Sequence, residues 1–286
     1  MPESFPLNLP KISNSPFAAA LPDPRSAFSW AVKELGRRLV RMVRDVGSGG
    51  IFFWTVVKTS AKPPFRRTLL FQQLEFIGNQ SLGIILLTGF FTGAVFALQI
   101  GGIFQIFRAE GLMGAATGKA LTRELAPLMT AFLLTGRAGS AMTAEISTMK
   151  VNEQVDAMEA MAVDPVSYLV VPRFLAALLI TPFLCGVFIF IGVIGAYLVG
   201  VGIFNIDVGV FMEKIKWIVK PGDISSGLQK ALIFAAIYST MACRYGLRAS
   251  GGAKGVGIAT TDSVVRTLLV VLLFDVVITY LQIRFE

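Results

Sequence analysis

The stretch LGIILLTGFFTGAVFALQIGGIFQIF, residues 82–107, contains no charged side chain. A second uncharged stretch, FLAALLITPFLCGVFIFIGVIGAYLVGVGIF, occupies residues 174–204. Each is longer than the roughly 20 residues that an α-helix needs to cross a bilayer. Hydrophobic residues make up 54% of the 286 residues and charged residues only 15%, whereas soluble domains carry about 25% charged residues. The sequence therefore predicts an all-α integral membrane protein.

Working outward from these two stretches, the apolar pattern predicts five membrane spans, at about 78–106, 112–136, 170–202, 225–244 and 263–283. The first span contains Gly89 and Gly93, and the third contains Gly192, Ala196 and Gly200. Small residues four positions apart share one helix face and allow another helix to approach closely. We therefore expect both faces to be packed against neighbouring helices.

The segment before the spans divides into two parts. Residues 1–26 contain repeated prolines and are predicted to be a disordered, proline-rich extension. In residues 27–67, basic side chains alternate with tryptophan, phenylalanine and leucine, which is typical of amphipathic helices lying at a membrane interface. A solvated soluble helix is the alternative for this part. Residues 68–286 then form the predicted transmembrane domain.

Basic residues are concentrated before the first span and in the link between the fourth and fifth spans. Cytoplasmic segments near membrane spans carry an excess of lysine and arginine. The N-terminus, residues 136–165 and residues 244–262 are therefore expected to be cytoplasmic. Five spans place the C-terminus on the far side of the membrane. The formal charge of +8 is then explained by orientation and headgroup contact, and nucleic acid is not expected as a partner.

Several kinds of catalytic and binding chemistry are not supported. The sequence has no histidine, which removes the commonest metal ligand and general base. Cys185 and Cys243 lie in apolar segments and suit packing, so we predict no metal site. GAATGKA, residues 114–120, is not a phosphate-binding loop, because only three residues separate its glycines and Ala120 follows Lys119. We predict a non-catalytic chain that binds no cofactor itself.

Four ionisable residues near membrane depth need partners: Lys119, Arg123, Glu124 and Asp275. A charge in the membrane is costly and needs a partner. Arg123 and Glu124 are adjacent and point about 100° apart on a helix, so each is expected to find its partner on another helix. Asp275 could form a structural pair with another span. Alternatively, Asp275 and Glu124 could titrate in a proton-coupled secondary transporter.

The charged stretch 136–165 has helical periodicity. One face is apolar and methionine-rich, and the other faces are acidic; the apolar face holds Met142, Ile146, Met149, Val155, Met158 and Ala162. Such a helix could bury its methionines against its own bundle. It could equally present them, or its acids, to a soluble partner. The periodicity leaves both possibilities open.

Specific motifs then identify a family. LTRELAPLMTAFLLTGRAGSAMTAEISTMKVNEQVDAMEAMAVDPVSYLVVPRFLA, residues 121–176, closely resembles the MlaE family of permeases. FFTGAVFALQ (90–99) and TTDSVVRTLLVVLLFDVVITYL (260–281) resemble the same family. These permeases are transmembrane subunits of ABC transporters that work with MCE-domain proteins to move lipids between membranes. The resemblance covers about residues 30–284.

The resemblance implies a homodimer with an interfacial elbow helix, five spans and a cytoplasmic coupling helix between spans 2 and 3, at about 141–160. It implies separate ATPase subunits that hold ATP and magnesium, a ring of MCE-domain proteins on the far face, and phospholipid as cargo. The membrane would be a bacterial inner membrane or an organelle envelope of bacterial origin. The lipid cavity falls on Phe96, Gln99, Ile103, Phe104 and Phe107. ATPase coupling falls on Glu145, Met149, Lys150, Glu153, Asp156 and Glu159.

Overall fold

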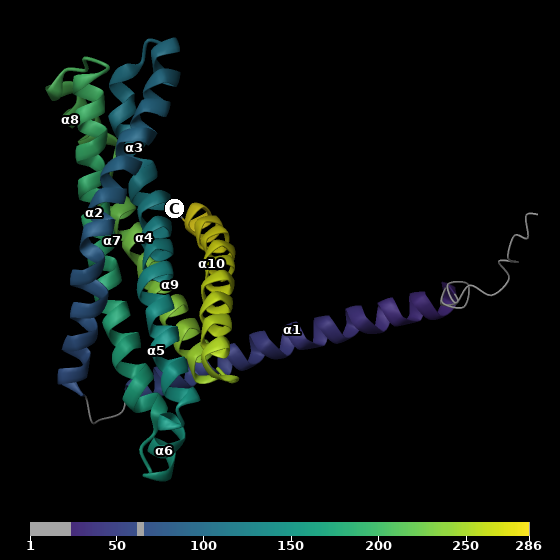
Figure 1. The fold of residues 1–286 in the computed structure, drawn as a ribbon. Helices are drawn as coiled ribbons and strands as arrows, with labels where there is room; N and C mark the ends of the chain where they lie inside the picture. Colours follow the sequence, from purple (N-terminus) through teal and green to yellow (C-terminus); the bar gives the residue numbers. More distant parts are fainter. Residues whose placement is uncertain (1–23, 62–65, 286) are drawn as a thin grey trace, which may run out of the picture. The chain divides into compact units, whose positions relative to one another are not determined.

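The computed structural model describes residues 24–61 and 66–285 (Figure 1). The chain divides into two compact units, Met1–Gly50 and Ile51–Glu286. Helix α1 (Pro24–Ser60) runs through this division as one helix, where the sequence predicts a pair. The predicted disordered extension lies outside the described residues except for its last positions, which open α1. The described ranges contain helices and turns but no strand, in agreement with the predicted all-α class.

Three helical segments are long and apolar enough to cross a membrane: α2 (Arg67–Ile106), the run Val166–Gly202, and the part Gly252–Arg284 of α10 (Gly252–Phe285). They contain the first, third and fifth predicted spans. The run Val166–Gly202 consists of a π-helical turn, η4 (Val166–Val170), and α7 (Val171–Gly202). The predicted fourth span corresponds to α9 (Pro221–Leu247), which lysine, arginine and aspartate make less apolar.

The predicted second span lies in an almost unbroken helical path from Met113 to Val151. Two π-helical turns, η2 and η3, interrupt the α-helical geometry, and such turns redirect the side chains around them. Turn η2 carries Arg123 and Glu124, and turn η3 carries Arg137. In order, the path contains α3 (Met113–Ala120), η2 (Leu121–Leu125), α4 (Ala126–Leu134), η3 (Thr135–Gly139) and α5 (Ser140–Val151), and a short 3₁₀ turn, η1 (Glu110–Leu112), precedes it.

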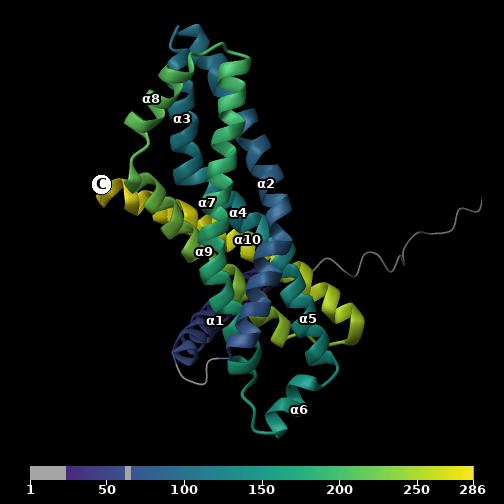
Figure 2. The ribbon, with the colours of Figure 1, turned by 90° about the vertical axis from the view of Figure 1, so that its left-hand side faces the viewer.

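Helices α2 and α7 lie side by side along much of their length (Figures 1 and 2). A Cβ atom on Gly93 would lie 1.9 Å from the backbone oxygen of Gly192. On Gly195 it would lie 2.3 Å from the backbone oxygen of Phe90. Because no side chain fits in these places, the two backbones can approach closely. The predicted packing role of the small residues in spans 1 and 3 is confirmed.

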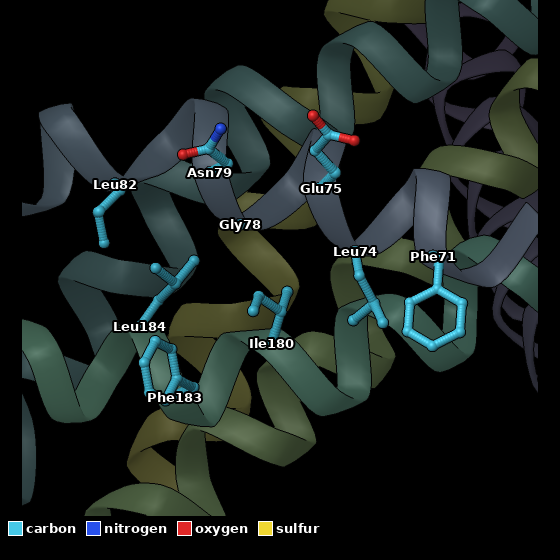
Figure 3. A pocket seen from close by; sticks show the side chains of 9 residues that line it. All are labelled: Phe71, Leu74, Glu75, Gly78, Asn79, Leu82, Ile180, Phe183 and Leu184. Carbon is cyan, nitrogen blue, oxygen red and sulfur yellow. The ribbon is translucent and has the colours of Figure 1, made fainter.

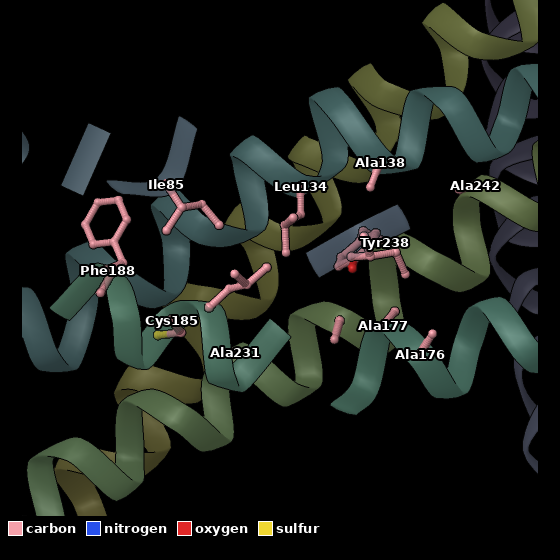
Figure 4. Close-up of a cluster of buried hydrophobic side chains, with 14 of the residues drawn as sticks. Ile85, Leu134, Ala138, Ala176, Ala177, Cys185, Phe188, Ala231, Tyr238 and Ala242 are labelled. Atoms are coloured by element: carbon pink, nitrogen blue, oxygen red, sulfur yellow. The ribbon is translucent and has the colours of Figure 1, made fainter. Parts of the chain in front are cut away.

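The largest hydrophobic cluster joins α2, α4, α7 and α9 (Figure 4). Much of it is alanine, which lets the helices pack closely around a few larger side chains. Tyr238 is fully buried there, and its hydroxyl is 3.0 Å from that of Thr181, so its polar atom is satisfied. Cys185 and Cys243 are free and buried, which confirms their predicted packing role.

The stretch 136–165 is not one helix. It contains the end of η3, then α5, and then α6 (Gln154–Ala160), with a break at Asn152 and Glu153. Glu153 has a φ of 60°, a left-handed conformation that ends helical geometry. Periodicity over 136–165 does not reveal this break, because the residues on both sides favour a helix. Figure 2 shows α6 at the end of its unit, opposite α8 (Val208–Ile218).

Candidate functional site

A cluster of charged side chains lies inside the bundle and is centred on Lys230 of α9. Its ammonium nitrogen lies 2.5 Å from Glu124 Oε2, 3.3 Å from Asp275 Oδ1 and 2.7 Å from the hydroxyl of Thr279. Lys230 is fully buried, whereas the side chain of Glu124 is 39% exposed. The cluster joins η2, α9 and α10. A buried ammonium of this kind is tolerable only because oxygen acceptors surround it.

Sequence reasoning missed Lys230, although the signal was present. Lys230 lies within the predicted fourth span, directly before the apolar stretch ALIF. An ionisable residue inside a span defaults to a functional or paired role. Applying that rule to α9 would have identified Lys230 as a partner for Glu124 and Asp275.

A second charged group lies on α3, η2 and α9. Arg123 donates to Asp223 across 3.2 Å, and the ammonium of Lys119 is 4.0 Å from the same oxygen. Asp223 also accepts a hydrogen bond from the backbone N–H of Lys220, which fixes the start of α9. Arg123 and Glu124 therefore do pair with other helices and not with each other, as predicted. Asp275 likewise has the basic partner on another helix that a structural role requires.

The predicted coupling residues do not form one continuous surface. Glu145 pairs with Arg173 of α7 across 2.8 Å, and Arg173 is only 5% exposed. Arg173 also donates to the backbone oxygen of Leu169. The ion pair of Glu145 with Arg173 therefore links α5 to α7. Met142 and Ile146 are fully buried in the same region, so this half of the apolar face packs within its own bundle.

The other coupling residues lie around the break between α5 and α6. Lys150 pairs with Asp156, and this hydrogen bond raises the pKa of Lys150 above its ordinary value. Glu153 and Glu159 are exposed, and neither forms an ion pair within the part of the chain that the structure describes. Met149 is half-buried. We call residues 152–161, which include Glu153, α6 and the exposed Met161, the α6 tip.

The predicted lipid-cavity residues lie along the last turns of α2 and, for Phe107, directly after its end. Phe96, Gln99, Ile103 and Phe107 follow one another at steps of three, four and four residues, which places them on one face. Ile103 is 57% exposed and Phe107 73% exposed, and Gln99 is exposed as well. Phe104 instead packs partly against a core cluster that contains Ala97 and Met113. The structure thus presents an open, mostly apolar face here.

A pocket of 480 Å³ lies elsewhere, between the first turns of α2 and the first half of α7 (Figure 3). None of the predicted cavity residues lines it. We call it the α2–α7 groove. It is mostly apolar, and it is lined by Phe71, Leu74, Glu75, Gly78, Asn79, Leu82, Ile180, Phe183 and Leu184.

Comparison with known proteins places these features in a family. The family described as permease MlaE matches residues 70–281 of the chain. The intermembrane phospholipid transport system permease protein MlaE of Haemophilus influenzae is 38% identical over 254 residues, covering 87% of this chain and 95% of that protein. A probable ABC transporter permease protein of Rickettsia felis is 39% identical over 247 residues, covering 86% of this chain and 95% of the relative.

A plant protein is also similar. The chloroplastic protein TRIGALACTOSYLDIACYLGLYCEROL 1 of Arabidopsis thaliana is 37% identical over 215 residues, covering 75% of this chain and 61% of that protein. The match over residues 70–281 covers nearly all of the three apolar helices, and it includes the Lys230 cluster and the α6 tip. The chain therefore belongs to the MlaE permease family.

Proposed function

We propose that this chain is the non-catalytic permease subunit of an ATP-driven transporter that moves phospholipid between membranes together with MCE-domain proteins. The observation that carries the proposal is the family match over residues 70–281. It is supported by 38% identity to a permease whose name gives intermembrane phospholipid transport as its role. Separate ATPase subunits would bind the ATP and magnesium.

Five spans follow if the segments around α4 and α9 also cross the membrane. The Lys230 cluster supports this arrangement, because it neutralises charges from both segments with partners inside the bundle. The predicted topology then puts the α6 tip and the 244–262 link in the cytoplasm. The C-terminus lies on the far side, where the MCE ring would sit.

The α6 tip is the proposed contact for the ATPase. It combines exposed acids with the exposed Met161, and such a surface can dock in a groove of a partner. Helix α5 continues from the tip into the bundle and is tied to α7 by Glu145 and Arg173. Movement of the tip on ATP binding would therefore be transmitted along α5 towards η3 and the spans.

The exposed face at the end of α2 is the proposed wall of a lipid cavity in a homodimer. The single chain leaves three side chains of this face exposed: Gln99, Ile103 and Phe107. A second copy of the chain would enclose the apolar surface between two such faces. Acyl chains need an apolar, dry cavity, and that chemistry fits this face. Contraction of the cavity would pass lipid to or from the MCE ring.

The test is lipid transfer by proteoliposomes that contain the permease, its ATPase and its MCE-domain protein. Transfer is expected to require ATP and to stop when the ATPase can no longer hydrolyse it. Ile103→Asn should reduce transfer strongly while the complex still assembles. Leu87→Asn is the matched control, because Leu87 is also exposed on α2 but lies outside the cavity face.

Transfer that continued with a hydrolysis-deficient ATPase would overturn the proposal. The proton-coupled alternative predicts instead that transport follows a pH gradient and is lost in Asp275→Asn. The pairing of Asp275 with Lys230 supports the structural role of this carboxylate.

A further inference from the structure

The α2–α7 groove lies where α2 changes from polar to apolar. Up to residue 80 the helix contains Gln72, Gln73, Glu75, Asn79 and Gln80, and residues 82–107 contain no charge. A helix with this pattern places the change at the boundary between lipid headgroups and acyl chains. The groove therefore spans the depth at which an amphipathic lipid changes from polar to apolar.

The side chains that line the groove are also divided into an apolar part and a polar part. Phe71, Leu74 and Leu82 of α2 point towards Ile180, Phe183 and Leu184 of α7, and these six side chains form an apolar surface (Figure 3). Glu75 and Asn79 lie at the rim on α2 and point away from the apolar side chains of α7. The volume of 480 Å³ is within the range of about 300–1,000 Å³ that is usual for small-molecule sites.

A glycine lines the groove, and a proline lies beside it. Gly78 is buried, and a Cβ atom there would lie 2.8 Å from Ile180 Cγ1, so a larger residue would reach into the space between the helices. Pro182 lies inside α7 and cannot donate to the backbone oxygen of Leu178. A proline in this position locally weakens the helix beside the pocket, next to Phe183.

The carboxylate of Glu75 at the rim of the groove determines which lipid headgroup fits there. Glu75 is exposed and forms no ion pair with another described residue. A carboxylate at the edge of the hydrocarbon is stabilised by a cation that can donate hydrogen bonds to it. We propose that the α2–α7 groove binds one phospholipid whose headgroup carries a primary ammonium, with an acyl chain along the apolar wall and the ammonium at Glu75.

Other lipid headgroups fit this rim less well. An anionic headgroup would be repelled by Glu75, and a quaternary ammonium has no N–H to donate to the carboxylate. The site lies far along α2 from the proposed cavity residues at 96–107, so it is a separate site between α2 and α7. The inference rests on the proposed membrane location of the chain but does not require ATP-driven transport.

The experiment measures lipid retention by the full-length chain in mild detergent without ATPase, using native mass spectrometry. The probes are phosphatidylethanolamine, phosphatidylcholine and phosphatidylglycerol of identical acyl composition. We expect phosphatidylethanolamine to bind about threefold more tightly than the others, which is the size of effect that an exposed ion pair gives. Glu75→Gln should abolish this preference, whereas Glu213→Gln, which changes an exposed acid on α8, should retain it.

A second pair of variants tests the apolar wall. Leu82→Trp should fill the groove and lower occupancy by all three lipids, whereas Leu87→Trp, on an exposed part of α2 outside the groove, should not. Equal binding of the three lipids, or a headgroup preference that survives Glu75→Gln, would identify annular lipid only and overturn the inference. The chain could keep its preference for phosphatidylethanolamine while the full complex fails to transfer lipid with ATP. That result would count against the proposed function and would leave the lipid site standing.

Discussion

The Lys230 cluster and the α6 tip both collect charges, but they use them in opposite ways. Around Lys230, a fully buried ammonium is surrounded by Glu124, Asp275 and Thr279. At the tip, Glu153 and Glu159 are exposed and without ion pairs in the described chain. Charges inside a bundle must be neutralised by the bundle itself, whereas exposed charges keep their hydration and can meet a partner. The difference separates residues that hold the fold from residues that can bind.

The largest expected effect is that of Lys230→Met, which leaves two carboxylates in the bundle without their cation. Removing one partner of a buried ion pair costs about 3–5 kcal/mol. Because the Glu124 side chain is 39% exposed and keeps part of its hydration, we expect a loss at the lower end of this range. The variant should melt at a clearly lower temperature than the unmodified protein in detergent. Lys216→Met on the exposed side of α8 is the control and should melt unchanged.

A second variant tests the same cluster by removing the two carboxylate charges together with the charge of Lys230. The triple variant Lys230→Met, Glu124→Gln and Asp275→Asn should recover a large part of the lost stability, since no unpaired charge remains. A triple variant as unstable as Lys230→Met alone would show that Lys230 acts through packing and not through its charge.

Glu145→Gln should have an intermediate effect, because it leaves the buried Arg173 without its counter-charge. Arg173 keeps its hydrogen bond to Leu169, so the expected loss is about 1–3 kcal/mol. Thermal unfolding measures it, with Glu159→Gln as the control. Equal melting of the two variants would mean that Glu145 belongs with the binding acids of the tip.

Asp156→Asn should have a smaller effect, because the side chains of the Lys150–Asp156 pair are about 30% and 52% exposed. Such pairs contribute about 0.2–1 kcal/mol after solvent screening. Faster hydrogen exchange of the α6 amides should reveal the loss, with little change in α7. Unchanged exchange in α6 would show that the break at Asn152–Glu153 is held by backbone contacts alone.

The smallest stability effect belongs to Glu153→Lys combined with Glu159→Lys, which leaves the Lys150–Asp156 pair intact. Surface changes of this kind cost about 0.5 kcal/mol or less. Co-purification of the ATPase should nevertheless fall sharply, because the charge of the proposed contact is reversed. Glu213→Lys on α8, at the opposite end of the unit, is the control and should not affect co-purification. If the double variant co-purified normally with the ATPase, the α6 tip would not be the contact.

Much of the fold followed from patterns that are visible in the chain. Long apolar stretches predicted the three apolar helices, and small residues four positions apart predicted faces that pack closely against neighbouring helices, which the structure shows between α2 and α7. The separate partners of Arg123 and Glu124 followed from helical geometry. The break in the 136–165 helix could not be predicted in this way, because the left-handed conformation of Glu153 is set by the turn into α6.

Composition, hydropathy and family motifs determined the class of protein, the positions of the most apolar helices and the family. These are local properties of the chain, since a stretch without charges must be buried or inserted wherever it lies. Tertiary structure alone decided which charges are paired. Glu124 and Lys230 are 106 positions apart, and Arg123 and Asp223 are 100 apart. Their contacts depend on how π turns and helix packing direct each side chain, and periodicity carries no information about that.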